Sequence, residues 1–181
     1  MPTPPVILLL SGSLRAGSSN EAVLHTACAV APEAGVEGVR YDGLAGLPHF
    51  NPDDDTDQLP SPVAELRAAI DRAAGILICT PEYAGTLPGS FKNLLDWTVG
   101  GTEISDKPVA WINAAAPGRG SGAETTLRTV LDYTGATVVE QACVRIPVDR
   151  GTTDPAGLIP DEGVCRQLVQ VLRLLAFTPQ L

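Results

Sequence analysis

Residues 6–20 read VILLLSGSLRAGSSN, an apolar run that passes directly into a loop of glycine, serine and arginine. The run over residues 6–10 has no polar interruption, which is typical of a strand buried on both faces of a parallel sheet. Beyond the loop, apolar residues recur at helical spacing over residues 20–31. This stretch therefore predicts a buried strand, a loop and a helix in succession.

The rest of the chain repeats this alternation of short strands and amphipathic helices. Further strands are predicted over residues 36–40, 76–80, 109–113 and 138–144. Apolar stripes with a helical period begin at Val63, Phe91, Leu127 and Val164. Five strands and five helices predict an α/β fold with a doubly wound, five-stranded parallel sheet and helices on both faces. Because no linker or internal repeat divides its 181 residues, the chain is expected to form a single domain, 1–181.

The charge of the chain limits its partners. It carries 12 Lys and Arg against 21 Asp and Glu, a net charge of −9, so its average field repels nucleic acids. A site for an anion would need backbone N–H groups and a few well-placed cations to be locally positive. The acidic run at residues 53–57 lacks the spaced ligands and turn glycine of a calcium loop. It is expected to be a solvated acidic loop, and no metal site is predicted.

The cysteines show no metal-binding pattern. Cys28, Cys79, Cys143 and Cys165 form no C-x-x-C pair and have no histidine at ligand spacing. They are interpreted as small buried hydrophobic residues of a protein in the reducing cytoplasm. The amino-terminal apolar run is too short for a signal peptide or a membrane span. A cytoplasmic protein without a membrane partner is therefore expected.

The loop GSLRAGSSN, residues 12–20, has the composition of an anion-binding site. It joins a strand to a helix N-terminus, whose free N–H groups and partial positive charge favour anions, and Arg15 can bind two oxygens at once. Helix capping explains part of the pattern, because Ser18 and Glu21 have the spacing of a capping box, with the Glu21 carboxylate turned back onto the cap. Capping does not explain Ser13 or Arg15. These two residues favour phosphate binding.

Two common nucleotide-binding motifs are missing from this loop. It contains neither G-x-x-x-x-G-K-[ST] nor G-x-G-x-x-G. The first absence argues against a nucleotide-hydrolysing P-loop, and the second leaves a Rossmann-type NAD site unsupported. Any nicotinamide dinucleotide would therefore bind transiently, as a substrate, rather than remain bound as a cofactor.

A second unusual loop follows the third predicted strand. Residues 80–97 read TPEYAGTLPGSFKNLLDW, where two prolines stiffen the loop and two glycines allow unusual turns. Such a loop could bind the polar edge of a flavin ring, and a proline-stopped strand followed by a helix explains the spacing equally well. Together, GSLRAGSSN and TPEYAGTLPGSFKNLLDW resemble the two signature loops of the NADPH-dependent FMN reductase family. In strand–helix order and length, the resemblance covers nearly the whole chain.

The resemblance implies a flavodoxin-like fold with bound FMN and with NADPH or NADH as co-substrate. It implies FMN phosphate contacts from Ser13, Arg15, Ser18, Ser19 and Asn20. It implies contacts to the flavin ring, mostly through the main chain, from Pro81, Glu82, Tyr83, Ala84, Gly85 and Thr86. The loop after the fourth strand would let the ring lie close at Ala115 and Gly118. Arg119 in that loop is either an extra cation for a visiting dinucleotide or a solvated loop arginine.

The chain departs from the family at one position of the second loop. Many members have asparagine where this chain has Ala84. The missing side-chain amide removes one polar contact beside the ring, which can shift the flavin potential or the choice of acceptor. The backbone donors remain, so FMN binding is still expected.

The resemblance also implies an activity. The family includes flavin, quinone, chromate and azo-dye reductases, so hydride is expected to pass from NAD(P)H through FMN to a small-molecule acceptor in a ping-pong mechanism. That acceptor would be free flavin, a quinone, an azo compound or a metal oxyanion. Because FMN carries the chemistry, no side chain is predicted to be catalytic. The family further implies a dimer or tetramer. The alternative is a flavodoxin-type electron carrier or a flavin-binding sensor without NAD(P)H turnover.

Overall fold

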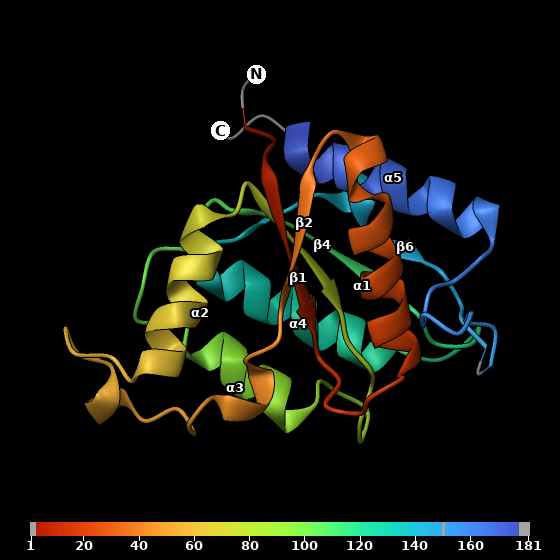
Figure 1. The fold of residues 1–181 in the computed structure, drawn as a ribbon. Helices are drawn as coiled ribbons and strands as arrows, with labels where there is room; N and C mark the ends of the chain where they lie inside the picture. The colour runs from red at the N-terminus through yellow and green to blue at the C-terminus, as the bar shows by residue number, and fades with distance from the viewer. Residues whose placement is uncertain (1–2, 150, 178–181) are drawn as a thin grey trace.

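The computed structural model describes residues 3–149 and 151–177, and its strands lie in one parallel sheet (Figure 1). The four long strands are β1 (Val6–Ser11), β2 (Glu37–Tyr41), β3 (Gly75–Cys79) and β4 (Pro108–Asn113). Two short strands, β5 (Thr137–Val138) and β6 (Val144–Arg145), both pair with β4. The order β2-β1-β3-β4-β5 is that of flavodoxin-like doubly wound sheets. The predicted α/β fold is therefore confirmed.

Helices cover both faces of the sheet, as predicted. α1 (Ser19–Val30) and α5 (Glu162–Phe177) pack together on one face. α2 (Ser61–Arg72), α3 (Gly89–Asp96) and α4 (Ser121–Thr134) cover the other face, with α4 behind the sheet in Figure 1. The central strand β1 serves both layers, because successive side chains of a strand point to opposite faces. Ile7 and Leu9 lie in the first core, and Leu8 and Leu10 lie in the second. This double burial explains the uninterrupted apolar run.

The predicted fifth strand, residues 138–144, is interrupted in the structure. A 3-10 helix at Glu140–Ala142 separates β5 from β6, and its Ala142 is buried in the core formed with α5. The chain bonds to β4 before this helix, through Val139 N–H and the Val109 carbonyl, and after it, through Ile146 N–H and the Asn113 carbonyl. The prediction of one continuous strand is therefore wrong. Its hydrophobic residues are buried partly by helix packing, which an apolar run alone does not distinguish from strand pairing.

The acidic run at residues 53–57 also differs from its expectation. Asp55 is paired with Arg67 of α2, whose Nη2 lies 2.8 and 3.0 Å from the two carboxylate oxygens. The two side chains are only 11% and 9% exposed, and Arg67 Nε donates to the Trp97 carbonyl at 2.9 Å. Asp53, Asp54 and Asp57 are exposed. The expectation of a solvated loop is therefore wrong for Asp55, which fastens the loop to α2 and to the end of α3.

The structure also shows how the cysteines lie and whether a helix could cross a membrane. All four cysteines are free thiols; Cys79 is buried and the other three are half-buried. The interpretation as buried residues is therefore correct for Cys79 and wrong for the other three. Among residues 3–149 and 151–177, no helix has both the length and the apolar character that crossing a membrane requires. In the same part of the chain, no group of three or more His, Cys, Asp or Glu side chains could hold a metal ion.

Candidate functional site

A cleft of about 610 Å³ opens at the carboxyl edge of the sheet, where the loops after β1, β3, β4 and β6 meet. This is the edge at which open α/β sheets bind their ligands, and the volume suits a small-molecule site. Six residues that sequence analysis assigned to a cofactor line the cleft: Arg15, Ser19, Asn20, Pro81, Glu82 and Ala115. The first three come from the loop after β1 and the start of α1. The loops after β3, β4 and β6 line the rest of the cleft.

The start of α1 combines a cap with open donors. Ser18 is the N-cap; the residue is 3% exposed, and its hydroxyl accepts the Glu21 N–H at 3.1 Å. The Glu21 carboxylate turns back, as expected, and accepts the Gly17 N–H at 2.7 Å. Glu21 lines a neighbouring cavity rather than the cleft. The Glu21 carboxylate is therefore hydrogen-bonded to the loop and lies outside the cleft.

The N–H groups of Ser19 and Asn20 make no hydrogen bond within the described part of the chain. They lie at a helix N-terminus, where partial positive charge attracts anions. The Asn20 amide is oriented by a thiol beneath it, because Cys79 Sγ donates to Asn20 Oδ1 at 3.3 Å. Burial raises the pKa of the Cys79 thiol, so the thiol stays protonated and remains a donor. The amide nitrogen of Asn20 is thereby left available to a ligand.

Ser13 lies outside the cleft. It lines the neighbouring cavity, about 230 Å³, together with Arg40 and Tyr41. Its hydroxyl accepts the Arg15 N–H at 3.2 Å, a local turn contact of the kind that serine often makes in loops. This contact helps to shape the loop, and the sequence did not reveal it. Arg15 lines both the cleft and this cavity.

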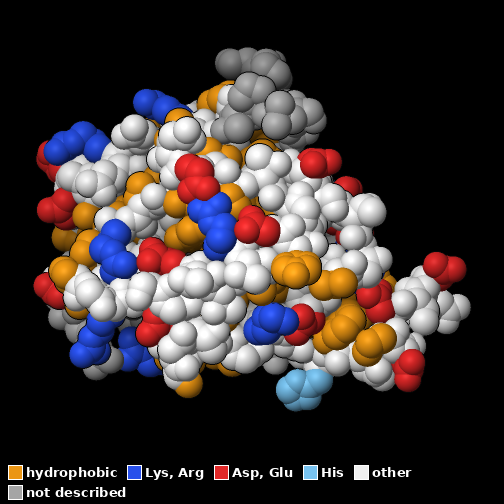
Figure 2. All heavy atoms as spheres, turned by 180° about the vertical axis from the view of Figure 1, so that it is seen from behind, with side chains coloured by type: hydrophobic (Ala, Val, Ile, Leu, Met, Phe, Trp, Pro, Cys, Tyr) orange, Lys and Arg blue, Asp and Glu red, His pale blue; other side chains and the backbone are white. Residues whose placement is uncertain are grey.

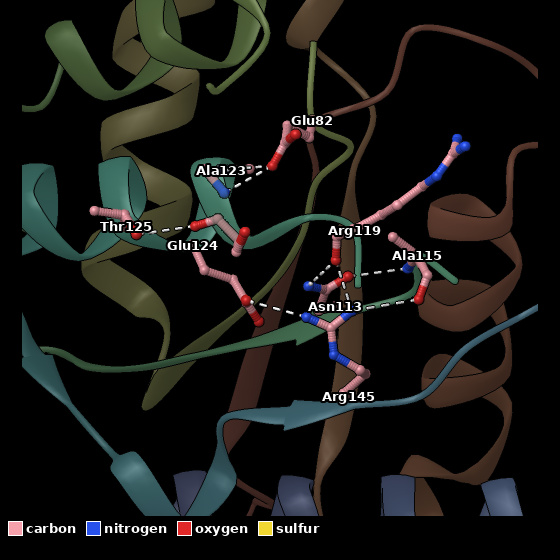
Figure 3. A network of polar contacts seen from close by, with 10 residues as sticks. Glu82, Asn113, Ala115, Arg119, Ala123, Glu124, Thr125 and Arg145 are labelled. Carbon is pink, nitrogen blue, oxygen red and sulfur yellow. Dashed lines mark hydrogen bonds and ion pairs between the residues drawn. The ribbon is translucent and has the colours of Figure 1, made fainter. Parts of the chain in front are cut away.

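The loop after β3 is fastened to the start of α4. Glu82 Oε2 accepts the N–H groups of Gly122 and Ala123 at 2.7 and 3.2 Å (Figure 3). α4 has no side-chain cap from its own N-cap residue, Gly120. Glu82 therefore supplies that cap from another loop, and its charge is offset by the helix N-terminus. The Thr86 and Thr126 hydroxyls, 2.8 Å apart, form a second link between the same two elements.

Tyr83, Ala84, Gly85 and Thr86, which the resemblance assigns to the flavin ring, form an exposed hairpin and do not line the cleft. Tyr83 and Thr86 exchange two backbone hydrogen bonds of 3.0 and 3.1 Å. Between them, Ala84 and Gly85 have φ values of 51° and 77°. Two positive φ values characterise a type I′ turn, for which Asn-Gly is the preferred sequence. The asparagine that many family members carry at position 84 therefore has a conformational advantage over alanine.

Replacing Ala84 by glycine is expected to raise the free energy of unfolding by about 1 kcal/mol, because the left-handed conformation is unfavourable for residues with a Cβ. A shift of that size corresponds to roughly 2–4 °C in Tm for a chain of this length, which thermal unfolding would detect. The matched control is Ala64→Gly on the exposed side of α2, where glycine should lower stability. An unchanged or lower Tm for Ala84→Gly would contradict the strain at this turn.

The loop after β4 is held by a polar network (Figure 3). Asn113 accepts the Ala115 N–H at 2.9 Å and donates to the Arg119 carbonyl at 3.3 Å. Arg145 of β6 donates to the same Arg119 carbonyl at 2.7 Å and pairs with Glu124 of α4 at 3.3 Å. Predicted residue Gly118 lies in this loop but does not line the cleft. Asn113 and Arg145 therefore hold the loop after β4 in place, from the side on which β6 lies.

Unpartnered cations gather at the cleft. Eight of the described Lys and Arg side chains have hydrogen-bond or ion-pair partners. Among residues 3–149 and 151–177, the side chains of Arg15, Arg72 and Arg119 have none. Arg15 and Arg119 both line the cleft, from different loops. In a chain with a net charge of −9, this concentration of free positive charge makes the cleft suited to anionic ligands.

Arg119, which the sequence suggested as a possible cation for a dinucleotide, also lines the cleft. Six further lining residues were not assigned to a ligand from the sequence: Thr80, Ala114, Ala116, Gly120, Val148 and Asp149. Most of them extend loops that had already been singled out. Val148 and Asp149 come from the loop after β6, which sequence analysis left out. That loop also follows a parallel strand, so its place at the carboxyl edge of the sheet was predictable from topology.

Comparisons with known proteins show what the chain is similar to. A family model described as NADPH-dependent FMN reductase matches residues 5–150. The chain is 31% identical over 167 residues to an NAD(P)H-dependent FMN reductase of Pseudomonas aeruginosa, covering 91% of this chain and 89% of the relative. It is 31% identical over 170 residues to a quinone reductase of Escherichia coli, covering 90% and 88%. Among solved structures, the flavoenzyme NAD(P)H:(acceptor) oxidoreductase FerB of Paracoccus denitrificans superposes with a TM-score of 0.80 at 25% identity, covering 95% of each chain.

Proposed function

Since the chain belongs to the NADPH-dependent FMN reductase family, an oxidoreductase family that uses FMN and NAD(P)H, we propose that it passes hydride from NAD(P)H through FMN to a small-molecule acceptor. The observation that carries this proposal is the cleft at the carboxyl edge of the sheet. There the unpartnered Arg15 and the open N–H groups of Ser19 and Asn20 lie together. This set of donors suits a phosphate monoester, which is the anionic group of FMN.

Within this proposal, each loop has a part in binding the cofactor. Arg15, Ser19 and Asn20 hold the phosphate. Pro81, Glu82 and Ala115 line the part of the cleft suited to the ring. Ser18 and Ser13 support the phosphate loop from behind, through the cap and the turn described above. Thr80, whose side chain leaves room only for glycine at position 12, brings the first two loops into contact.

FMN held in this cleft would supply the redox chemistry between a reduced nicotinamide and the acceptor. The protein's own residues bind and orient the reactants, and we assign no side chain as a catalytic acid or base. Two carboxylates line the cleft: Glu82 is bound to the N–H groups at the start of α4, whereas Asp149 has no side-chain partner among the described residues. A single cleft serving both nicotinamide and acceptor in turn would give a ping-pong mechanism.

A quinone is the acceptor class that the relatives favour. The E. coli relative is named as a quinone reductase. Free flavin, azo compounds and metal oxyanions remain members of the wider acceptor class that we propose.

We also propose that the protein forms a dimer or tetramer. Large apolar side chains are exposed at Tyr133 of α4 and at Val99 beyond α3, at 90% and 64%. Figure 2 views the molecule from behind, the side on which α4 lies, and shows hydrophobic side chains gathered at its lower right. On this face Lys and Arg lie among Asp and Glu.

We further propose a cytoplasmic protein of one domain. The free cysteines suit the cytoplasm, and the single described sheet suits one domain.

Anaerobic spectroscopy tests the proposed function. The purified protein, incubated with FMN and then separated from unbound FMN by gel filtration, is expected to remain yellow and to lose the colour rapidly when NADPH or NADH is added without oxygen. Adding a quinone should then restore the colour. Initial rates are then measured against NAD(P)H concentration at several fixed quinone concentrations. The double-reciprocal lines should be parallel, as ping-pong kinetics require. A yellow protein that NAD(P)H does not bleach would instead be an electron carrier or a sensor.

A further inference from the structure

Arg119 places an unpartnered cation at the cleft. The residue is exposed and lines the cleft, and its guanidinium has no partner in the described part of the chain. In Figure 3 its side chain leaves the polar network and extends away from Asn113 and Arg145. The nearby Arg145, by contrast, is engaged with Glu124 and with main-chain carbonyls. Only Arg119 can offer its charge to a ligand from this loop.

The backbone that carries this side chain is fixed. The Arg119 carbonyl accepts hydrogen bonds from Arg145 and Asn113 at 2.7 and 3.3 Å, and its N–H donates to the Ala116 carbonyl at 3.1 Å. On its carboxyl side, Gly120 has a φ of 87°, and a Cβ there would collide with the Asn113 amide. The loop therefore does not need to be ordered on binding, which reduces the entropic cost of a contact made by Arg119.

The charges of the cleft indicate what Arg119 binds. The FMN phosphate has its own donors in Arg15 and the start of α1, on a different loop. Glu82 is satisfied by the N-terminus of α4. Asp149 is then the one cleft carboxylate without a side-chain partner among the described residues. With FMN in place, Arg119 remains as a second cation that the cofactor phosphate does not require.

We propose that Arg119 binds the diphosphate of the nicotinamide dinucleotide during hydride transfer; this inference rests on the proposed function. The diphosphate is the phosphate group nearest to the nicotinamide ring, so it lies close to the cleft when that ring meets the flavin. NADH and NADPH share it. Arg119 therefore acts on both coenzymes alike and is a binding residue for the dinucleotide, without a part in holding FMN.

The test compares three hydride donors on the FMN-loaded protein without oxygen. NADPH and NADH carry the diphosphate, whereas N-benzyl dihydronicotinamide has the reactive ring and no phosphate. In Arg119→Met, the second-order rate constant for flavin bleaching should fall by about ten- to a hundredfold with both NADPH and NADH, the scale of a charge-assisted hydrogen bond. With the benzyl compound the rate constant should not change. Arg119→Lys, which keeps the charge, should lose less.

Two controls separate this contact from other effects. FMN affinity should be the same in Arg119→Met and the parent protein. Arg72→Met removes an unpartnered cation that lies outside the cleft, at the end of α2 that leads into β3 and hence at the opposite edge of the sheet, and should leave all three rate constants unchanged. A parent protein that no donor bleaches would overturn the proposed function itself.

Four results would overturn the inference while leaving the function intact. No loss with any donor would make Arg119 a solvated surface residue. An equal loss with the benzyl compound would place its effect on the flavin. Weaker FMN binding would assign Arg119 to the cofactor phosphate, and a loss confined to NADPH would assign it to the 2′-phosphate.

Discussion

Replacing Arg15 by methionine is expected to weaken FMN binding by about 1.5–3 kcal/mol, or roughly 10- to 150-fold in Kd. Arg15 lines the cleft, has no partner among the described side chains, and is the cation nearest in sequence to the open N–H groups of Ser19 and Asn20. Its removal leaves the phosphate with neutral donors only on that side. Titration of the apoprotein with FMN, followed by flavin fluorescence, measures the loss directly.

A matched control for this variant lies in the neighbouring cavity. Arg40 lines that cavity together with Arg15, but its guanidinium is paired with Asp42 at 2.8 Å. Arg40→Met removes the same charge and is expected to change FMN affinity little. Arg15→Lys should fall between the parent and Arg15→Met, because lysine keeps the charge without the paired donors of arginine. Equal effects of Arg15→Met and Arg40→Met would show that overall charge, rather than a contact, governs affinity.

Replacing Asp55 by alanine is expected to lower the free energy of unfolding by about 3–5 kcal/mol, because it leaves a buried charge without its partner. Arg67 is 7% exposed, and both oxygens of Asp55 lie within hydrogen-bond distance of its Nη2. The bond from Arg67 Nε to the Trp97 carbonyl would remain, but it does not neutralise the guanidinium. Urea unfolding followed by circular dichroism checks the prediction.

Two further variants make this result specific. Asp57→Ala changes an exposed residue of the same loop and should alter stability by no more than about 0.5 kcal/mol. Combining Asp55→Ala with Arg67→Met should recover part of the loss, since the unpaired charge is removed as well. If Asp55→Ala were as mild as Asp57→Ala, the pair would make no net contribution to stability.

Much of the fold could be predicted from the sequence, because its signals are local. The apolar run at residues 6–10 is buried from both faces of the sheet, and it reads as a central strand. The segment at residues 138–144 misled because its apolar residues are divided between strand pairing and packing against α5. Asp55 misled for a related reason: its partner lies 12 residues away on α2, and no pattern within the loop indicates that contact.

The site was predictable to a similar degree. Arg15, Ser19 and Asn20 stood out because phosphate binding requires such donors after a buried strand, and all three line the cleft. The side-chain roles of Ser13 and Glu82 could not be read from the motif, because each depends on a contact that only the folded chain makes. The positive φ of Ala84 was hidden for the same reason. Motif resemblance finds the loops, whereas the contacts within them decide what each residue does.

A crystal structure of the FMN complex tests the central claim most directly, because it locates the cofactor phosphate. We expect the phosphate within hydrogen-bond distance of the Arg15 guanidinium and of the N–H groups of Ser19 and Asn20, with the ring against Pro81, Glu82 and Ala115. A phosphate found instead in the cavity lined by Arg40 and Tyr41, or an FMN molecule bound away from the start of α1, would contradict the account.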